Sequence, residues 1–188
     1  MMTSEFLPMC LAEDQLCPLE KATSIVRRNL MLYDHNLYRS RIAQGLAIHS
    51  GSTPLPRGSN FHKVEWSCEL EELASVAVRG CPTKRTPNDT YGQNYEFFET
   101  EDTFDLENPY PLALERWVSP IMSRHFGNDA VTFNRDRDLQ SFANTSYRDI
   151  QDGGLIYNNG EGCRADADCI TYAGSTCDAE SGLSSPEV

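Results

Sequence analysis

The pattern of apolar positions predicts a first helix between residues 23 and 45. Its apolar residues recur with the spacing of one helical face, at Val26, Leu30, Tyr33 and Leu37. Thr23 or Ser24 can cap its start, and Gly45 is a suitable end. Its basic residues outnumber its acidic ones and are Lys21, Arg27, Arg28, Arg39 and Arg41. Since Lys and Arg rarely lie buried, we expect these cations on a solvated face.

Two more helices are predicted by the same spacing. Ser67 is the candidate N-cap of the second helix, and Gly80 followed by Pro82 marks its end. One face of this helix carries Trp66, Leu70, Leu73 and Ala77. The third begins near Pro111 and aligns Leu114, Trp117, Ile121 and His125 on one side. Because a proline inside a helix costs about 3 kcal/mol, we expect a break or kink at Pro120.

The rest of the pattern is more irregular. A short helix is predicted around residues 137–147, and Leu155–Tyr157 is predicted as a strand before a turn at Asn158-Asn159-Gly160. Residues 1–20 show neither a helical nor a strand period and are predicted as an irregular extension. Residues 161–188 hold three cysteines and few bulky apolar side chains, so order there needs covalent links. The pattern as a whole indicates a helix-rich α+β domain.

Composition and charge narrow the function classes. The chain has 188 residues, of which 39% are hydrophobic, enough for one domain with a real core. Sixteen basic residues against 28 acidic ones give a net charge of -12, which disfavours nucleic acid and anionic membrane surfaces as partners. No stretch approaches the roughly 20 apolar residues of a membrane-spanning helix. We therefore expect a protein that neither binds nucleic acid nor spans a membrane.

Seven cysteines favour an extracellular location, although a signal peptide is not evident. The disulfide candidates are Cys10, Cys17, Cys68, Cys81, Cys163, Cys169 and Cys177. The odd count leaves at least one thiol unpaired within the chain, and such a thiol invites pairing with another molecule. Two sequons, at Asn88 and Asn144, are candidate glycosylation sites and agree with secretion.

Residue patterns typical of catalysis and metal binding are missing from the sequence. There is no Gly-rich phosphate loop and no nucleophile elbow, and no two of the histidines have the spacing of two ligands on one helix: His35, His49, His62 and His125. The spacing of the last three cysteines does not match a zinc site, so disulfides are the better interpretation. No catalytic residue is therefore predicted.

The first predicted helix contains the pattern H-N-x-x-R-S-x-x-A-x-G, formed by His35, Asn36, Arg39, Ser40, Ala43 and Gly45. This pattern resembles the opening helix of the CAP superfamily, which includes cysteine-rich secretory proteins, venom allergens and the activation-associated secreted proteins of nematodes. Further matches follow in family order at residues 64–71, Ala74, Cys81, residues 92–94, Trp117, residues 139–144 and a hinge-like run from residue 156 to Asp178. The resemblance thus covers residues 24–183, and the shared order makes it specific.

The resemblance implies an α-β-α sandwich at residues 21–150, after the extension at 1–20 and before a small cysteine-rich, hinge-like tail at 151–188. In the family, central strands lie between the motif matched here by residues 139–144 and the hinge. Here residue 150 is followed almost directly by the hinge-like residues. We therefore expect an incomplete central sheet. Ser184 also stands where the family's hinge ends in cysteine, so we expect a thiol among Cys163, Cys169 and Cys177 to lack its family partner.

The resemblance also bears on function. The family's metal tetrad of two histidines and two glutamates is degenerate here: Gln93, Pro120 and Ser141 stand at three ligand positions, and residues 81–90 contain no histidine for the fourth. We therefore expect no metal and no cofactor. What the resemblance implies is a secreted, non-enzymatic protein that binds an extracellular host protein, in host interaction or immune modulation. The alternative is an extracellular carrier of a lipid or sterol.

Overall fold

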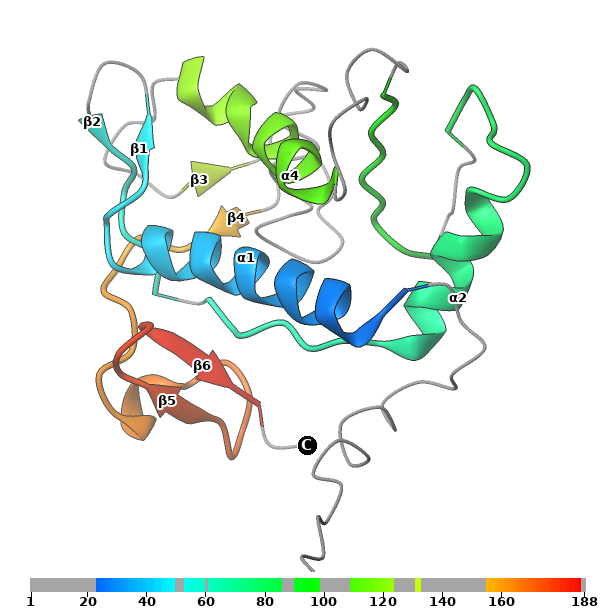
Figure 1. Ribbon diagram of the computed structural model, residues 1–188. Coiled ribbons are helices and arrows are strands. Elements are labelled where there is room, and N and C mark those ends of the chain that lie inside the picture. The colour runs from blue at the N-terminus through cyan, green and yellow to red at the C-terminus, as the bar shows by residue number, and fades with distance from the viewer. Residues whose placement is uncertain are drawn as a thin grey trace, which may run out of the picture.

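The computed structural model describes residues 23–49, 53–59, 61–85, 90–98, 109–123, 131–132 and 155–186. Within these residues, the long helix α1 (Ile25–Ala43) lies between α4 (Tyr110–Val118) and a hairpin of β5 (Thr176–Asp178) and β6 (Leu183–Ser185) (Figure 1). Helix α2 (Cys68–Ala77) lies beside the N-terminal end of α1. No helix in this part of the chain is both long and apolar enough to cross a membrane.

The described strands form short antiparallel pairs. Strand β1 (Ile48–His49) pairs with β2 (Thr53–Pro54), and β3 (Val131–Thr132) pairs with β4 (Leu155–Tyr157). In the β5–β6 hairpin, Cys177 lies opposite Ser184. Two short 3-10 helices, η3 (Ser119–Ser123) and η5 (Asp166–Asp168), complete the set. Helices and antiparallel pairs together make an α+β protein.

Four local predictions are confirmed. Ser24 caps α1 by accepting a hydrogen bond from the Arg27 amide at 3.4 Å, and Ser67 caps α2 by accepting one from the Leu70 amide at 3.3 Å. At Pro120 the α-helix gives way to the 3-10 helix η3. Leu155–Tyr157 is a strand. The helix predicted at residues 137–147 lies outside the described residues.

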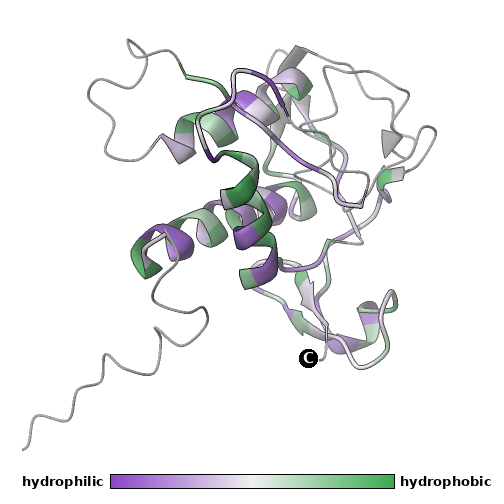
Figure 2. Cartoon of the chain, turned by 90° about the vertical axis from the view of Figure 1, so that its right-hand side faces the viewer, coloured by the Kyte–Doolittle hydropathy of each residue, from purple (hydrophilic) through white to green (hydrophobic). Residues whose placement is uncertain are grey.

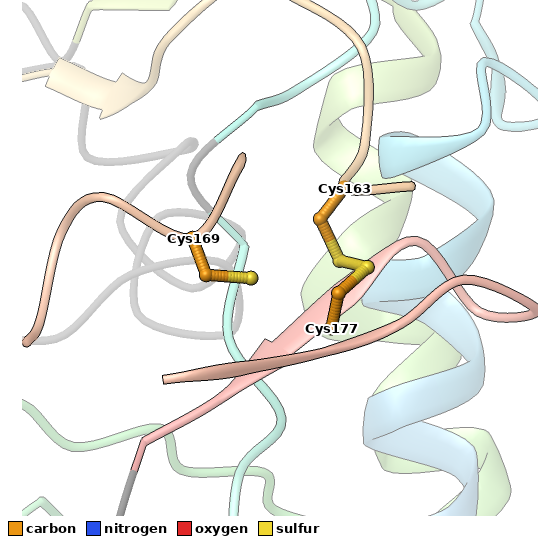
Figure 3. Close-up of side chains that lie close together, drawn as sticks. All are labelled: Cys163, Cys169 and Cys177. Atoms are coloured by element: carbon orange, nitrogen blue, oxygen red, sulfur yellow. A yellow bond between two sulfur atoms is a disulfide. The ribbon is translucent and has the colours of Figure 1, made fainter. Parts of the chain in front are cut away.

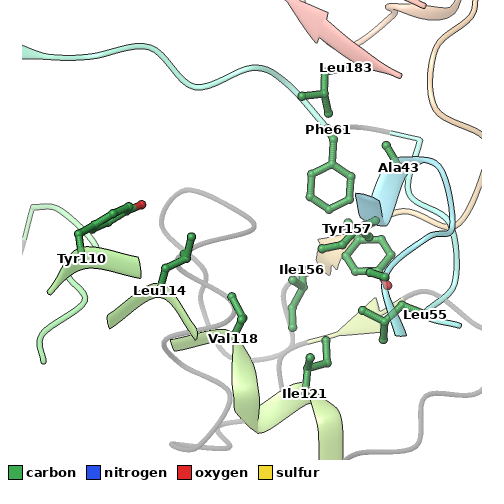
Figure 4. Close-up of a cluster of buried hydrophobic side chains, with 12 residues drawn as sticks. Ala43, Leu55, Phe61, Tyr110, Leu114, Val118, Ile121, Ile156, Tyr157 and Leu183 are labelled. Carbon is green, nitrogen blue, oxygen red and sulfur yellow. The ribbon is translucent and has the colours of Figure 1, made fainter. Parts of the chain in front are cut away.

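The core forms where α1, α4, η3, β4 and β6 meet (Figure 4). Its most deeply buried large side chains are Tyr157, Ile42, Leu55, Ile121, Ile156 and Leu183. Leu183 comes from the predicted cysteine-rich tail and is 0% exposed. The tail is therefore joined to the core of the protein by an apolar side chain, while its disulfide links two residues of the tail itself, Cys163 and Cys177.

The apolar faces that the spacing predicts on α1 and α2 do not lie in the core. Val26 and Tyr33 are 64% and 63% exposed, and Leu70 and Leu73 are also exposed. Apolar α1 residues are buried only near its C-terminal end, where Ile42 and Ala43 reach the core. The apolar spacing locates both helices correctly, but it selects the wrong face because polar side chains make the contacts elsewhere.

The prediction that the cations of α1 face solvent is also wrong for two of them. Arg28 and Arg39 are buried, and Glu71 is the buried residue of α2. Each arginine has a specific partner that compensates the loss of water, as the next subsection describes. Burial of a charged residue thus depends on the partner that it meets in the fold. The spacing of residues along one helix gives no information about that partner.

Candidate functional site

The residues that carry the family resemblance on α1 contact the segment 61–71. The Asn36 side chain forms two hydrogen bonds with the Val64 backbone: its Nδ2 donates to the carbonyl oxygen at 3.0 Å, and its Oδ1 accepts from the amide at 2.8 Å. This pair satisfies both backbone groups of a residue that lies in neither a helix nor a strand. Asn36 therefore holds the extended segment against the helix.

Arg39 fixes the same segment at a second point. Its Nε donates to the His62 carbonyl oxygen at 2.8 Å, and its guanidinium lies 5.2 Å from the centre of the Phe61 ring. Burial lowers the pKa of Arg39 to about 10, so the side chain still carries its charge at neutral pH. The combination of a hydrogen bond and a cation–π contact explains why this cation is tolerated inside the protein.

A third group joins α1 to α2. Arg28 donates from Nε to Glu71 Oε2 at 2.9 Å and from Nη2 to Glu71 Oε1 at 3.0 Å, and Trp66 Nε1 donates to the same carboxylate at 2.8 Å. Burial alone would raise the pKa of Glu71, but the hydrogen bonds from Arg28, Trp66 and Thr23 outweigh it and lower the pKa. Glu71 is therefore a buried carboxylate that is charged at neutral pH and fully engaged in holding the two helices together.

His35, the first residue of the family motif, is also used structurally. Its Nδ1 lies in hydrogen-bond contact with the Tyr110 hydroxyl of α4, and both groups approach the Met31 carbonyl oxygen at 3.1 Å. Burial lowers the pKa of His35, which favours the neutral ring at neutral pH. This contact joins α1 to α4, on the side opposite the β5–β6 hairpin.

Ser40 near the end of α1 and Gln44, its C-cap, hold the hinge, which we define as residues 161–186. Ser40 Oγ donates to the Ser181 carbonyl oxygen at 2.7 Å, and Gln44 Nε2 donates to the Glu180 carbonyl oxygen at 2.9 Å. Close backbone packing adds to this contact, because a Cβ on Gly162 would approach the Gly182 oxygen to 2.9 Å. The motif side chains of α1 therefore position three separate parts of the chain.

The hinge contains a cluster of three sulfur atoms (Figure 3). Cys163 and Cys177 form a disulfide, and the free thiol of Cys169 lies so close that the three sulfur atoms are all within 4.8 Å of one another. The Cys169 thiol has a hydrogen bond with Ser184, whose hydroxyl also donates to the Phe61 carbonyl oxygen at 3.2 Å. His62 Nδ1 contacts the same hydroxyl. Ser184, where the family resemblance places a cysteine, thus lies directly beside Cys169.

The structure describes two of the other cysteines and neither of the sequon asparagines. Cys68 is disulfide-bonded, and Cys81 is a free, exposed thiol. Cys10, Cys17, Asn88, Asn144 and Ser141 lie outside the described residues, so their predicted roles stay predictions. The division of the chain at residues 20 and 150 also stays a prediction.

The tetrad positions inside the described residues do not fit a metal ion. Gln93 supplies a neutral amide and Pro120, in η3, supplies no side-chain ligand. Within the described residues, the only close group of three or more metal-ligating side chains is the sulfur cluster, and two of its sulfur atoms are joined in the disulfide. A metal at the family position therefore has no donor set to hold it in this part of the chain.

Sequence reasoning missed Glu71 and Ser184 as site residues. Glu71 lies inside the matched motif at residues 64–71, in the first turn of α2 and four residues after the N-cap Ser67, and the sequence gives it no partner. Ser184 was noticed only as a replaced cysteine. In both cases the available signal was the position of the residue in the family pattern. An acidic side chain or a hydroxyl at such a position indicates a hydrogen-bond partner elsewhere in the fold.

Comparison with known proteins agrees with this arrangement. The model of the cysteine-rich secretory protein family, CAP, matches residues 32–173. The Ancylostoma secreted protein of Ancylostoma caninum is 26% identical over 177 residues, which covers 80% of this chain and 41% of that protein. The chain thus spans less than half the length of that relative.

Two solved structures share the fold. BmVAL-1 superposes with a TM-score of 0.78 at 22% identity, over 92% of this chain and 99% of that one. Na-ASP-1 superposes with a TM-score of 0.75 at 23% identity, over 88% of this chain and 47% of that one. These superpositions confirm the CAP-like α+β class. Since the family match covers most of the chain and includes motif residues that hold the fold together, the chain belongs to the CAP, or cysteine-rich secretory protein, family.

Proposed function

We propose that this CAP protein is secreted and acts without catalysis, by binding an extracellular protein of a host organism through its two N-terminal helices. The observation that carries the proposal is a set of exposed apolar side chains on α1 and α2, which we call the helical apolar surface: Val26, Leu30, Tyr33, Leu70, Leu73 and Val76. Figure 2 looks onto the side of the molecule that carries α2, where hydrophobic and hydrophilic positions alternate along the helices. Contiguous exposed apolar patches mark protein-binding sites, and we propose that these six side chains form one.

The internal contacts of these helices support the proposal. The Arg28–Glu71 pair joins α1 to α2, so the apolar residues of both helices are carried by one connected unit. Arg28 and Glu71 are buried between the helices, while the residues of the helical apolar surface are exposed. Exposed apolar side chains beside a buried ion pair are expected where the apolar side chains have a partner of their own.

A non-catalytic role is supported by how the motif side chains are used. His35, Asn36, Arg39 and Glu71 each hydrogen-bond to the backbone or to another side chain that positions an element. The incomplete central sheet is part of the same proposal, because residue 150 is followed almost at once by the strand β4. Secretion is supported by the family match and by the disulfide in the hinge.

The experiment compares binding to host extracellular proteins before and after charges are placed on the helical apolar surface. The double variant Leu30→Glu, Leu73→Glu should fold normally, because both side chains are exposed, yet lose saturable binding to a retained host protein. The matched control is Ile170→Glu, at a hinge residue that is 88% exposed, and it should bind like the unchanged protein. Equal binding by all three proteins would contradict the proposed surface. Sterol binding by the same preparations, unaffected by the double variant, would favour the carrier alternative instead.

A further inference from the structure

We propose that Cys163, Cys169 and Cys177 form a thiol–disulfide exchange site, in which the Cys169 thiol attacks the neighbouring disulfide and moves it to a new pair of cysteines. The substrate is the chain's own disulfide. This proposal is independent of the helical apolar surface, since it concerns the hinge alone.

The geometry brings attacking and attacked atoms together. All three sulfur atoms lie within 4.8 Å of one another, and Figure 3 shows the Cys169 side chain directed toward the disulfide. Cys163 is buried, with 5% exposure, whereas Cys169 and Cys177 are half-buried and can exchange protons with solvent. A free thiol placed beside a disulfide is the arrangement that exchange requires.

The reaction balances without an added oxidant or reductant. The Cys169 thiol first loses its proton to water. Its thiolate then attacks the Cys163 sulfur, so that a Cys163–Cys169 bond forms while the Cys163–Cys177 bond breaks. The electron pair of the broken bond leaves on Cys177, which takes up a proton. Attack on Cys177 gives the Cys169–Cys177 bond and frees Cys163 by the same accounting.

The surroundings of Cys169 make the resting exchange slow and sensitive to pH. Burial, together with the carboxylates of Asp166 and Asp168, raises the pKa of the Cys169 thiol, and the hydrogen bond with Ser184 acts in the opposite direction. Asp166 and Asp168 belong to η5 on the same loop, whereas His62 acts from across the hinge through its contact with Ser184. Because only the thiolate attacks, exchange accelerates as the pH rises toward the pKa of the Cys169 thiol.

Exchange would change one part of the hinge and leave another in place. Leu183 is buried in the core, and Ser184 is hydrogen-bonded through its backbone to Phe61 and Lys63, at 3.0 and 2.8 Å. These contacts hold β6 whichever cysteines are paired. The exposed loop would change with the pairing: a Cys163–Cys169 bond would close residues 164–168 into a loop, whereas a Cys169–Cys177 bond would close residues 170–176, which include Ile170 and Tyr172. The site thus alters the surface of the hinge without detaching it.

The test follows which cysteine is free over time in the oxidised, full-length protein. The protein is incubated in mildly alkaline buffer without added thiol, quenched with acid, labelled with N-ethylmaleimide and mapped by mass spectrometry of unreduced peptides. At time zero the label in the hinge should be on Cys169. With incubation it should appear on Cys163 or Cys177, at a rate independent of protein concentration. That rate should rise roughly tenfold per pH unit while the thiol remains mostly protonated.

Three variants make the result decisive. Cys81→Ser removes the exposed thiol elsewhere in the described chain and should exchange like the unchanged protein. Cys169→Ser should keep the Cys163–Cys177 bond and show no hinge label at any time. Cys163→Ser, produced under oxidising conditions, should carry a Cys169–Cys177 disulfide. Label that stays on Cys169 throughout the alkaline incubation, or Cys163→Ser protein with Cys169 and Cys177 both free, would overturn the proposal.

Discussion

Helix α2 and the β5–β6 hairpin are both short elements held against α1, but the contacts that hold them are chemically opposite. The contact between α1 and α2 uses a buried ion pair, Arg28 with Glu71, and leaves apolar residues of both helices exposed. The hairpin uses one buried leucine, Leu183, and hydrogen bonds from Ser40 and Gln44 to the backbone of its turn, while the disulfide joins its Cys177 to Cys163 within the hinge. The comparison teaches that neither hydrophobicity nor charge along a segment reveals which of its residues holds it in place.

The two kinds of contact also differ in why stability is lost when one residue is replaced. A buried charge that loses its partner remains desolvated and uncompensated, so removing one side is more harmful than the net value of the pair. A truncated leucine leaves a cavity, whose effect depends on how far the surroundings relax. Single substitutions in the two regions therefore provide a direct comparison.

The largest effect is expected from Glu71→Gln. The substitution keeps the shape of the side chain but leaves Arg28 buried without its counter-charge, and we expect a loss of about 3 to 5 kcal/mol in the free energy of unfolding. Urea denaturation followed by circular dichroism measures it. The control Glu69→Gln, on an exposed residue of the same helix, should change stability by less than about 0.5 kcal/mol.

A double variant sharpens the interpretation of this loss. Replacing both partners, Arg28→Met with Glu71→Leu, removes the stranded charge, so most of the stability lost in Glu71→Gln should return. If the double variant were as unstable as the single one, the loss would come from packing rather than from an uncompensated charge.

In the hinge, Leu183→Ala should destabilise the protein by about 3 kcal/mol, within the range for a fully buried leucine. The same denaturation experiment applies. Leu46→Ala is the matched control, because Leu46 is an exposed leucine beside the end of α1. A Leu183→Ala protein as stable as the Leu46→Ala protein would mean that the disulfide and backbone contacts hold the hairpin without the leucine.

These expectations show which parts of the fold could be predicted from sequence. The helix starts at Ser24 and Ser67 and the break at Pro120 depend on local chemistry, and each was predicted correctly. The burial of Arg28 and Glu71 depends on two residues 43 positions apart, and no pattern within one helix contains that information. The family motifs include Glu71 but not Arg28, so they did not reveal this pair. They marked the right segments without giving the role of each side chain.

The sulfur cluster also has features that could be predicted from sequence and features that could not. The spacing of the cysteines predicted disulfides over a zinc site and their odd count an unpaired thiol, while the family resemblance, through Ser184 in place of a cysteine, implied that this thiol lies in the hinge. Which thiol is free, and that it lies beside the disulfide, depends on how η5 and the hairpin fold together.

A smaller effect on stability is expected from a change of pH. It distinguishes the buried Arg28–Glu71 pair from the partly exposed pair of Lys63 with Asp178. The hydrogen bond with Lys63 lowers the pKa of Asp178 to about 2, and that of Glu71 is lowered by its partners despite burial. Both carboxylates thus have folded pKa values below their unfolded values of about 4. Their contributions are fully present above about pH 4 and are lost as the pH falls through the folded pKa.

Urea denaturation between neutral pH and about pH 2 should therefore show stability falling below about pH 4. Lys63→Met should remove one part of this loss of stability at low pH. Added salt should reduce the same part, because the Lys63–Asp178 pair is partly exposed and screened. Glu71→Gln should flatten the part that salt leaves unchanged. An identical pH profile for both variants and the unchanged protein would show that neither carboxylate has a lowered pKa.

The smallest expected effect is that of zinc. Because Gln93 and Pro120 replace two ligands of the family's tetrad, calorimetric titration of the oxidised protein should show no saturable one-to-one site. Oxidation matters, since it keeps two sulfur atoms of the hinge cluster in the disulfide and so separates this question from binding by reduced cysteines. Gln93→Glu should still show no site, because one restored carboxylate does not form a set of three or four converging ligands. A tight site in the unchanged protein that persists after alkylation of Cys169 would contradict this prediction and locate the metal outside the hinge.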